Sequence, residues 1–310
     1  FDLMKVLYRC LVTSVLVLAL TANPPHFAGA DSTTQISSEE STLNLLKKKA
    51  RSGDANSQLH LAIVYRDGLH GEKNIKLAFH WFEQAAQSGD VSAQLRVANM
   101  LQKGLGTQTN QKAAYQWFSI AAENGNVDAL IAKATMLQYG TGTPANPPMA
   151  YELFMQAARK DRSDAQIHVA KMLWDGTGIP QNKSDALRWY EASSKLGNID
   201  AKNTLGTLYL KGDTVPKDTQ HGLELIIAAA SEGHPAAFQN LGLIYQLGLG
   251  LPKNNVYAYL WFAVAANIGH QTAEKFKEGL AISMSTVDVE KAKKLAASCK
   301  QKNYKKCISF

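Results

Sequence analysis

Histidines and cysteines are the residues of this sequence best suited to metal binding or nucleophilic chemistry. None of the histidines after residue 30 forms a helical metal-binding pair with a carboxylate between its members. No serine or cysteine lies in a sequence context typical of a catalytic nucleophile. We therefore expect no catalytic residue, no metal site and no cofactor. Turn or surface positions are expected for His60, His70, His80, His168, His221, His234 and His270.

Two glycine pairs, Gly140-Thr141-Gly142 and Gly176-Thr177-Gly178, are similar to phosphate-binding loops. No Lys-Ser or Lys-Thr follows either pair, and such pairs recur every 36 residues. This regular spacing indicates structural turns and not nucleotide sites.

The two cysteines after residue 30, Cys299 and Cys307, are eight residues apart. On one continuous helix they would be separated by about 12 Å, which exceeds the reach of a disulfide. If the helix ends near Lys302 and Asn303, the tail can fold back, and an oxidising compartment then favours a disulfide between the two. Two free thiols on a frayed tail are the alternative.

The net charge of +7 comes from the two ends of the chain. Residues 54–269 contain equal numbers of basic and acidic residues, and no basic stripe or basic-aromatic motif runs through them. This distribution argues against nucleic-acid binding and indicates solvated, lysine-rich helix faces at the ends.

Residues 1–30 have the pattern of a secretory signal peptide. Lys5 and Arg9 precede an apolar run over 11–20, and small residues at 28–30 supply a cleavage site. The apolar run would rise only about 15 Å as a helix, which is too short for a membrane anchor. We therefore expect export to the periplasm or secretion, a mature chain from Asp31, and no stable membrane insertion.

A period of 36 residues organises the sequence from residue 54 to residue 269. The six units are 54–89, 90–125, 126–161, 162–197, 198–233 and 234–269. The fifteenth position is glycine in every unit, at Gly68, Gly104, Gly140, Gly176, Gly212 and Gly248. Each unit therefore predicts a first helix, a glycine-containing loop and a second helix.

Both helices of the unit have their own signatures. The first has small residues at its fourth and ninth positions, which let neighbouring helices approach closely. The second follows a residue with a strong N-cap preference, namely Asn74, Asn110, Asn146, Asn182, Asp218 or Asn254. Its buried face repeats an aromatic pair such as Trp81-Phe82, followed by an Ala-Ala pair.

These signatures are nearly complete in the sixth unit, at Leu241-Gly242, Tyr245, Gly248, Gly250, Asn254, Ala258, Trp261-Phe262 and Ala265-Ala266. The pattern resembles the Sel1-like repeat family, a relative of the tetratricopeptide repeats, over residues 54–269. The resemblance implies an all-α, right-handed α/α solenoid of six 36-residue repeats with helical caps at both ends. The fifth unit departs most, because Gly222 replaces an alanine, and we expect altered local packing there.

A solenoid requires polar caps at its ends. Residues 31–53 are predicted to form a polar tail and an N-terminal capping helix that starts near residue 39. Residues 270–310 are predicted to form C-terminal capping helices and a lysine-rich tail. Ser285 and Asp288 indicate a capping box at the start of the last helix.

The resemblance also implies that the first helices line a concave face on which other proteins bind. We predict an apolar strip on that face, with Trp174 as its anchor. The strip consists of Leu59, Leu95, Ile131 and Ile167 at the sixth position of four units, with Ile63, Trp174 and Leu210 at the tenth and thirteenth positions. Packing of the sixth position between neighbouring helices is the alternative.

Two functions are in competition. The first is a monomeric, non-catalytic adaptor that binds a protein or peptide in the bacterial envelope or outside the cell. The second is a secreted β-lactamase-like or penicillin-binding repeat protein, a function linked to cysteine-rich relatives. Those relatives have a cysteine pair in each repeat, whereas residues 54–269 contain no cysteine. The sequence therefore favours the adaptor.

Overall fold

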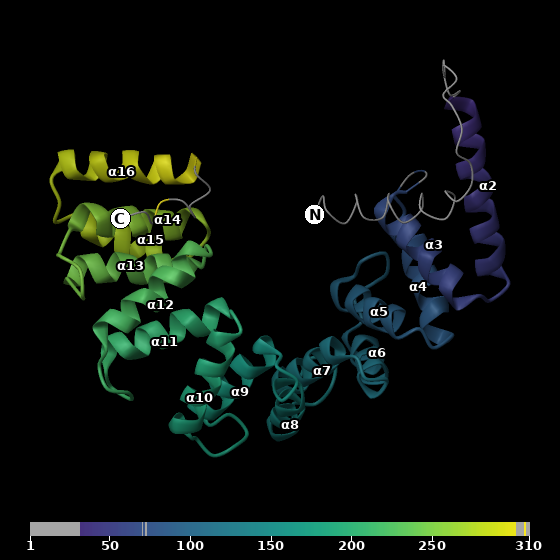
Figure 1. Ribbon diagram of the computed structural model, residues 1–310, viewed down its shortest axis with the longest axis horizontal. Coiled ribbons are helices and arrows are strands. Elements are labelled where there is room, and N and C mark those ends of the chain that lie inside the picture. The colour runs from purple at the N-terminus through teal and green to yellow at the C-terminus, as the bar shows by residue number, and fades with distance from the viewer. Residues whose placement is uncertain (1–31, 70, 72, 302–306, 308–310) are drawn as a thin grey trace, which may run out of the picture.

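The computed structural model is entirely helical over the residues it describes, which are 32–69, 71, 73–301 and 307. Consecutive helices pack as pairs, and the pairs follow one another along an arc with α2 and α16 at its two ends (Figure 1). The predicted all-α solenoid is confirmed. The predicted signal peptide at 1–30 lies outside the described residues.

Each unit contributes two helices. The first helices are α3 Ala55–Asp67, α5 Val91–Lys103, α7 Val127–Tyr139, α9 Ser163–Asp175, α11 Ile199–Lys211 and α13 Pro235–Leu247. The second helices are α4 Ile75–Gln87, α6 Gln111–Glu123, α8 Pro147–Ala158, α10 Lys183–Lys195, α12 Thr219–Ser231 and α14 Asn255–Asn267. Within the described ranges, no helix is long and apolar enough to span a bilayer.

Local capping groups fix where these helices begin and end. The side chains of all six predicted N-cap residues accept a backbone N–H from the first turn of the second helix, at Asn74, Asn110, Asn146, Asn182, Asp218 and Asn254. The six glycines at the fifteenth position have φ between 70° and 74°, the left-handed conformation that ends the first helix. Because these signals are local, the helix boundaries follow the sequence closely.

The loop between the two helices also needs glycine for space. A Cβ at Gly106 would collide with the carbonyl oxygen of Ile75, at the start of α4. The loop of one unit thus touches the second helix of the preceding unit. The second glycine of each Gly-x-Gly pair is therefore structural, as the spacing predicted.

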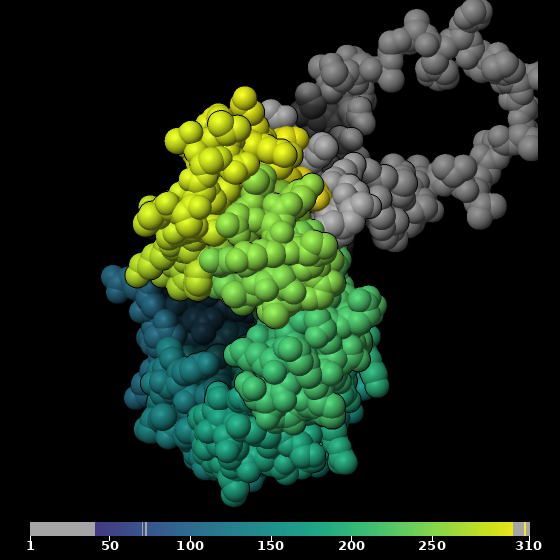
Figure 2. Space-filling view, turned by 90° about the vertical axis from the view of Figure 1, so that its left-hand side faces the viewer, coloured from purple at the N-terminus to yellow at the C-terminus, as the bar shows by residue number. Residues whose placement is uncertain are grey.

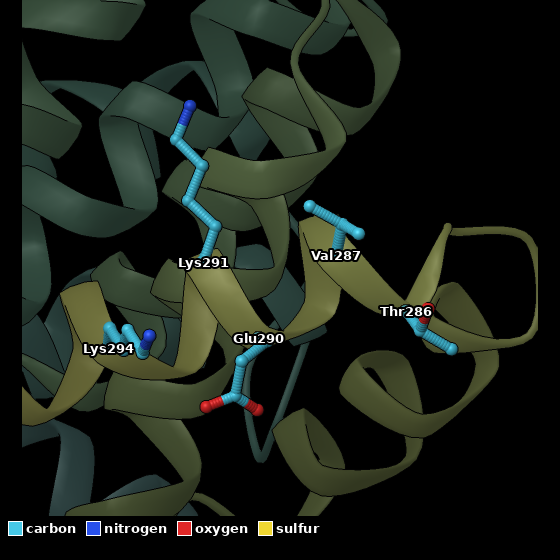
Figure 3. Close-up of a pocket in the computed structure, with 5 residues that line it drawn as sticks. All are labelled: Thr286, Val287, Glu290, Lys291 and Lys294. Carbon is cyan, nitrogen blue, oxygen red and sulfur yellow. The ribbon is translucent and has the colours of Figure 1, made fainter.

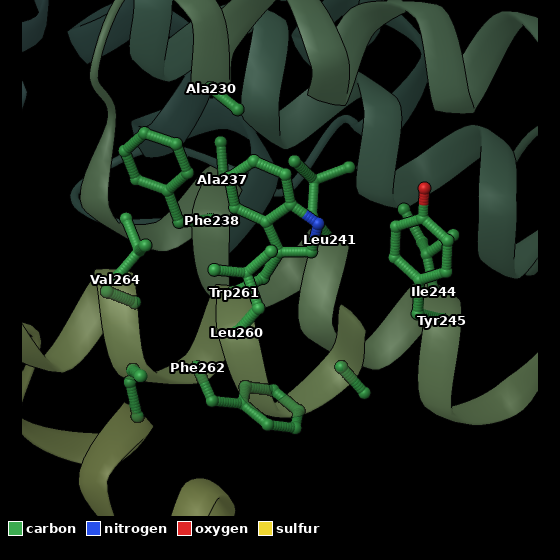
Figure 4. Close-up of a cluster of buried hydrophobic side chains, with 14 of the residues drawn as sticks. Ala230, Ala237, Phe238, Leu241, Ile244, Tyr245, Leu260, Trp261, Phe262 and Val264 are labelled. Carbon is green, nitrogen blue, oxygen red and sulfur yellow. The ribbon is translucent and has the colours of Figure 1, made fainter. Parts of the chain in front are cut away.

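Aromatic rings of the second helices pack against the first helix of their own unit. Trp261 is only 1% exposed, and its ring stacks on Phe238 with 5.7 Å between the ring centroids. Figure 4 shows Phe238 and Leu241 of α13 beside the Trp261 ring of α14, while Phe262 points to the other side of α14. Small alanines at the repeat positions bring the helices close enough for these contacts.

The arc has an inner and an outer side. In Figure 1, α5, α7 and α9 lie on its inner side, and α6, α8 and α10 lie on its outer side. Seen from the side, the molecule is hollowed between its blue first units and its green and yellow C-terminal part (Figure 2). In the second, third and fourth units the first helices therefore line the concave side.

Helices cover both ends of the array. The N-terminal helix α2, Ser32–Arg51, begins earlier than the sequence predicted. At the other end, α15 spans Gln271–Ala281, and α16, Thr286–Gln301, folds back on α14. The hydroxyl of Ser285 accepts the N–H of Asp288 at 3.1 Å and donates to its carboxylate at 2.8 Å. This pair fixes the start of α16, as the predicted capping box required.

Candidate protein-binding face

Residues at the sixth, tenth and thirteenth positions of the first helices lie along one face of each helix, which we call the inner stripe. Five of the seven predicted contact residues are half-buried there, at Leu59, Ile63, Leu95, Ile131 and Trp174. They pack against the core on one side and leave part of their surface open. The first four form an apolar series along α3, α5 and α7.

The other two predicted contact residues, Ile167 and Leu210, are buried in the core and are not part of an accessible strip. Ile167 is 4% exposed and Leu210 is 9% exposed. A Cβ on Gly222 of α12 would lie 3.0 Å from Cγ of Leu210, so the glycine gives Leu210 room to pack against α12. For Ile167, packing between neighbouring helices is what the structure shows.

Trp174, at the end of α9, already has partners within the chain. Its ring contacts the Tyr190 ring edge-on, with 6.2 Å between the centroids. The Nζ of Lys183 lies over the indole, 5.3 Å from its centroid. These contacts hold the indole in place while part of it remains exposed.

The inner stripe changes from apolar to amide at the fifth unit, where Asn203 and then Gln239 take the sixth position. The amide of Asn240 donates to Oδ1 of Asn203 at 2.8 Å, which joins α11 to α13. The hydroxyl of Thr272 donates to Oε1 of Gln239 at 2.6 Å, which joins α13 to α15. Hydrogen bonds therefore link the first helices of this half.

At the opposite end, Arg66 lies in the inner stripe, at the thirteenth position of its unit, and Arg96 lies beside the stripe, at the seventh position of the next unit. Arg66 donates from Nε and Nη2 to the two carboxylate oxygens of Asp67, both at 2.7 Å. The Cζ of Arg96 lies 5.6 Å from the centroid of the Phe82 ring. Burial, and next the charge of Arg66, lower the pKa of Arg96. Sequence analysis missed Arg96, although it is the one lysine or arginine at the seventh position of the six units.

His168 and His234 contact other side chains or backbone groups of the fold. His168 stacks on Phe154 with 4.4 Å between parallel rings, and burial lowers its pKa. The Nδ1 of His234 accepts the N–H of Ala237 at 3.2 Å, and its Nε2 lies 2.7 Å from Oδ1 of Asp200. In the described part of the chain, no group of three or more potential ligands could hold a metal ion.

The predicted disulfide is present, between Cys299 and Cys307, with 5.5 Å between their Cα atoms. This distance is far shorter than the roughly 12 Å expected on one continuous helix, so the two cysteines do not share one helix, as the prediction required. Cys299 is buried in the C-terminal core cluster, and Cys307 packs against it. The bridge therefore fastens the tail to the end of the solenoid.

A pocket of about 500 Å³ lies on α16. Its lining within the described residues is Thr286, Val287, Glu290, Lys291 and Lys294. Figure 3 shows Lys291 and Glu290 pointing to opposite sides of the helix, so the polar groups do not converge on one point. This arrangement is unlike a small-molecule site, in which a few polar groups converge within apolar walls.

The repeats match a known family. The Sel1 repeat matches six segments, at 55–90, 91–126, 128–161, 163–198, 199–234 and 237–270. The chain belongs to the Sel1 repeat family. These segments agree with the 36-residue units to within a few residues at each boundary. None of the curated proteins matches the chain significantly.

Solved Sel1 repeat structures share this fold. A Sel1 repeat protein from Oxalobacter formigenes is 26% identical, with a TM-score of 0.64, over 72% of this chain and 87% of that one. A protective antigen of uropathogenic Escherichia coli with the same fold is 21% identical, with a TM-score of 0.51, over 81% of this chain and 69% of that one.

Membership also sets the general kind of function. Sel1 repeat proteins typically act as scaffolds for protein interactions, and the fold is generally non-catalytic. In such a fold, contacts with partners come from the side chains that vary among repeats, since the recurring positions hold the helices together. In this Sel1 protein the chemistry of the inner stripe changes along the array, whereas the capping residues recur.

Proposed function

We propose that this Sel1 repeat protein is a non-catalytic adaptor whose concave face binds a segment of another protein. The observation that carries the proposal is the series Leu59, Ile63, Leu95 and Ile131 on the first helices. All four are half-buried apolar side chains on α3, α5 and α7, and α5 and α7 lie on the inner side of the arc. Covering their remaining surface would stabilise a complex by about 25 cal/mol per Å² of apolar area.

The extent of the stripe favours a peptide segment or a helix as the partner. The apolar series runs over three first helices, α3, α5 and α7. A small molecule would instead need converging polar groups in an enclosed pocket. An extended surface made of successive repeats is the form in which solenoids bind proteins.

We further propose that the protein acts as a monomer after export, in the bacterial envelope or outside the cell. The support comes from the signal pattern of residues 1–30 and from the Cys299–Cys307 disulfide, which persists in an oxidising compartment. Both features suit a folded protein beyond the cytoplasm.

The proposal is tested by crosslinking capture from the cell envelope, with the chain from Asp31 as bait. The test variant is Leu95→Gln with Ile131→Gln, because Gln239 occupies the same repeat position in the sixth unit and is compatible with the fold. The control is Ile120→Gln, at an exposed apolar residue of α6 on the outer side. We expect the double variant to lose a partner that the native chain and the control both capture.

Trp174→Ala, tested separately, decides whether the indole contributes to partner binding. Melting temperatures of all variants are measured by circular dichroism, so that lost capture is not confused with unfolding. Equal capture by the double variant and the native chain would exclude the inner stripe as the binding surface. Hydrolysis of a chromogenic β-lactam by the native chain would contradict the adaptor and favour the β-lactamase-like alternative.

A further inference from the structure

The seventh position of the first helices holds a planar group against an aromatic ring of the preceding unit at three places. His168 stacks on Phe154, and Phe276 of α15 stacks on Phe262 with 5.4 Å between the centroids. Arg96 lies over Phe82 in the same relationship. The contact is therefore a recurring part of the packing, and the residue that makes it can vary.

Arg96 is the one member of this set that carries a permanent charge, and the nearby acidic groups already have partners. Asp67 accepts both hydrogen bonds of Arg66, and the Asp90 carboxylate accepts the N–H of Ala93 at the start of α5, at 2.7 Å. Within the described residues, no acceptor is hydrogen-bonded to the guanidinium of Arg96. Five N–H donors in a fixed fork thus remain available.

The surroundings of Arg96 favour an incoming anion. Its pKa is lowered by burial and then by the charge of Arg66, and the opposing effects of Asp67 and Asp90 do not offset this. A carboxylate at this point would relieve the repulsion between the two cations and satisfy the open fork. Ile63, which precedes Arg66 by one helical turn, and Leu95, next to Arg96, supply apolar surface on the same two helices.

We propose that Arg96, with Arg66 beside it, binds a glutamate or aspartate side chain of the partner, within a segment whose apolar side chains contact Ile63, Leu95 and Leu59. This inference rests on the proposed adaptor function and specifies the chemistry of the partner. One open guanidinium fork matches one planar carboxylate through two parallel hydrogen bonds. A polyanion such as a nucleic acid would need a row of cations, whereas the seventh position offers only one lysine or arginine in the six units.

The inference is tested with three short fluorescent peptides that have leucines at identical positions. They differ at one central residue, which is glutamate, glutamine or lysine. Fluorescence anisotropy gives their affinities for the native chain, for Arg96→Gln and for the control Arg188→Gln. Arg188 is a suitable control because its side chain is 79% exposed on α10 and forms only a 3.6 Å ion pair with Asp185.

We expect the glutamate peptide to bind the native chain and the control about tenfold more tightly than the glutamine peptide, as a charge-assisted bond would produce. Arg96→Gln should abolish this preference, and added salt should reduce it in the native chain. If Arg96→Gln lowers the melting temperature, Arg96→Phe takes its place in the test. A phenylalanine at this position keeps a ring over Phe82, as Phe276 does over Phe262, and should also abolish the preference for the glutamate peptide.

Equal binding of the glutamate and glutamine peptides, or a preference that survives in Arg96→Gln, would overturn the inference. Absence of measurable binding of every peptide at millimolar concentration would overturn it as well. The crosslinking capture separates this failure from failure of the adaptor function. Equal capture of a partner by the native chain and by Arg96→Gln would support the adaptor function and exclude the carboxylate site.

Discussion

The Nζ of Lys202 on α11 lies 2.6 Å from Oε1 of Glu232, the residue that follows α12. These are the fifth and thirty-fifth positions of the fifth repeat, and two other repeats join the same positions with different chemistry. Those pairs are Ser88 Oγ donating to Gln58 Oε1 at 3.3 Å and Asn124 Nδ2 donating to Gln94 Oε1 at 3.1 Å. The fifth position of each of these repeats is therefore fastened to the end of its own second helix.

In the part of the chain that the structure describes, the fourth repeat lacks this connection, and its fifth position is joined only to the preceding repeat. Gln166 donates to the carbonyl of Ala158 at 3.2 Å, but its buried Oε1 has no partner within the described residues. The thirty-fifth position is Leu196, which is 48% exposed. We predict that Leu196→Asn stabilises the protein by about 1 kcal/mol, because it supplies a donor to a buried acceptor. Urea unfolding measures the change.

The backbone supports this substitution, since Leu196 has φ −81° and ψ 10° and Asn124 has φ −81° and ψ 14°. Leu196→Ala is the control, because it removes the exposed leucine without adding a donor. If Leu196→Asn is no more stable than Leu196→Ala, the hydrogen bond is not formed.

Gly222 allows the close approach of α11 and α12. A Cβ there would lie 2.8 Å from the carbonyl oxygen of Gly206 and 3.0 Å from Cγ of Leu210. Alanine favours a helix over glycine by about 1 kcal/mol, but overpacking costs about 1–3 kcal/mol. We therefore expect Gly222→Ala to lower the free energy of unfolding by roughly 1 kcal/mol, although alanine is the usual residue at this repeat position.

The matched control for this prediction is Gly279→Ala in α15. A Cβ at Gly279 has no atom within 4 Å, so only the helix preference acts. That substitution should raise the free energy of unfolding by up to about 1 kcal/mol. Stabilisation by both substitutions would show that α11 and α12 can separate at little cost.

Sequence alone predicted the features that depend on neighbours within a few residues. Asn74 caps α4 and Gly104 ends α5 because each satisfies backbone groups of its own helix turn. The 36-residue period then repeats these local signals, which fixes the order and length of the helices. The fold could be predicted because the local signals of successive units are consistent with one another.

Burial on the inner stripe could not be predicted in the same way. Ile131 and Ile167 occupy the same repeat position and are the same residue type, yet Ile131 is half-buried and Ile167 is buried. Their exposure depends on side chains of adjacent repeats, which a periodic pattern does not specify. The site at Arg96 was missed for a related reason, since its chemistry arises from Arg66 and Phe82 in the preceding repeat.

The disulfide should stabilise only the end of the array. Its short loop predicts a contribution of about 2–3 kcal/mol to the anchoring of the tail and α16. We expect Cys307→Ser to speed amide hydrogen exchange in α16 and to leave α9 unchanged, because repeats interact mainly with their neighbours. Cys307 is the residue to change, since Cys299 is a core residue. Equal loss of protection in α9 and α16 would contradict a local role.

His168 should make the stability depend on pH. Burial lowers its pKa in the folded chain below the ordinary value of 6.5. Between the lowered pKa and 6.5 the unfolded chain binds more protons, so stability is fully present above pH 6.5 and declines as the pH falls towards the folded pKa. His168→Phe removes the titrating group and should keep the ring contact with Phe154, as Phe276 does with Phe262.

We expect the difference in unfolding free energy between His168→Phe and the native chain to grow in favour of the variant as the pH falls below 6.5. Urea unfolding at a series of pH values measures this difference, and the subtraction cancels the other histidines. His221→Phe is the control, because His221 is exposed at the surface of α12. A constant difference for His168→Phe across the series would mean that His168 titrates alike in the folded and unfolded chains.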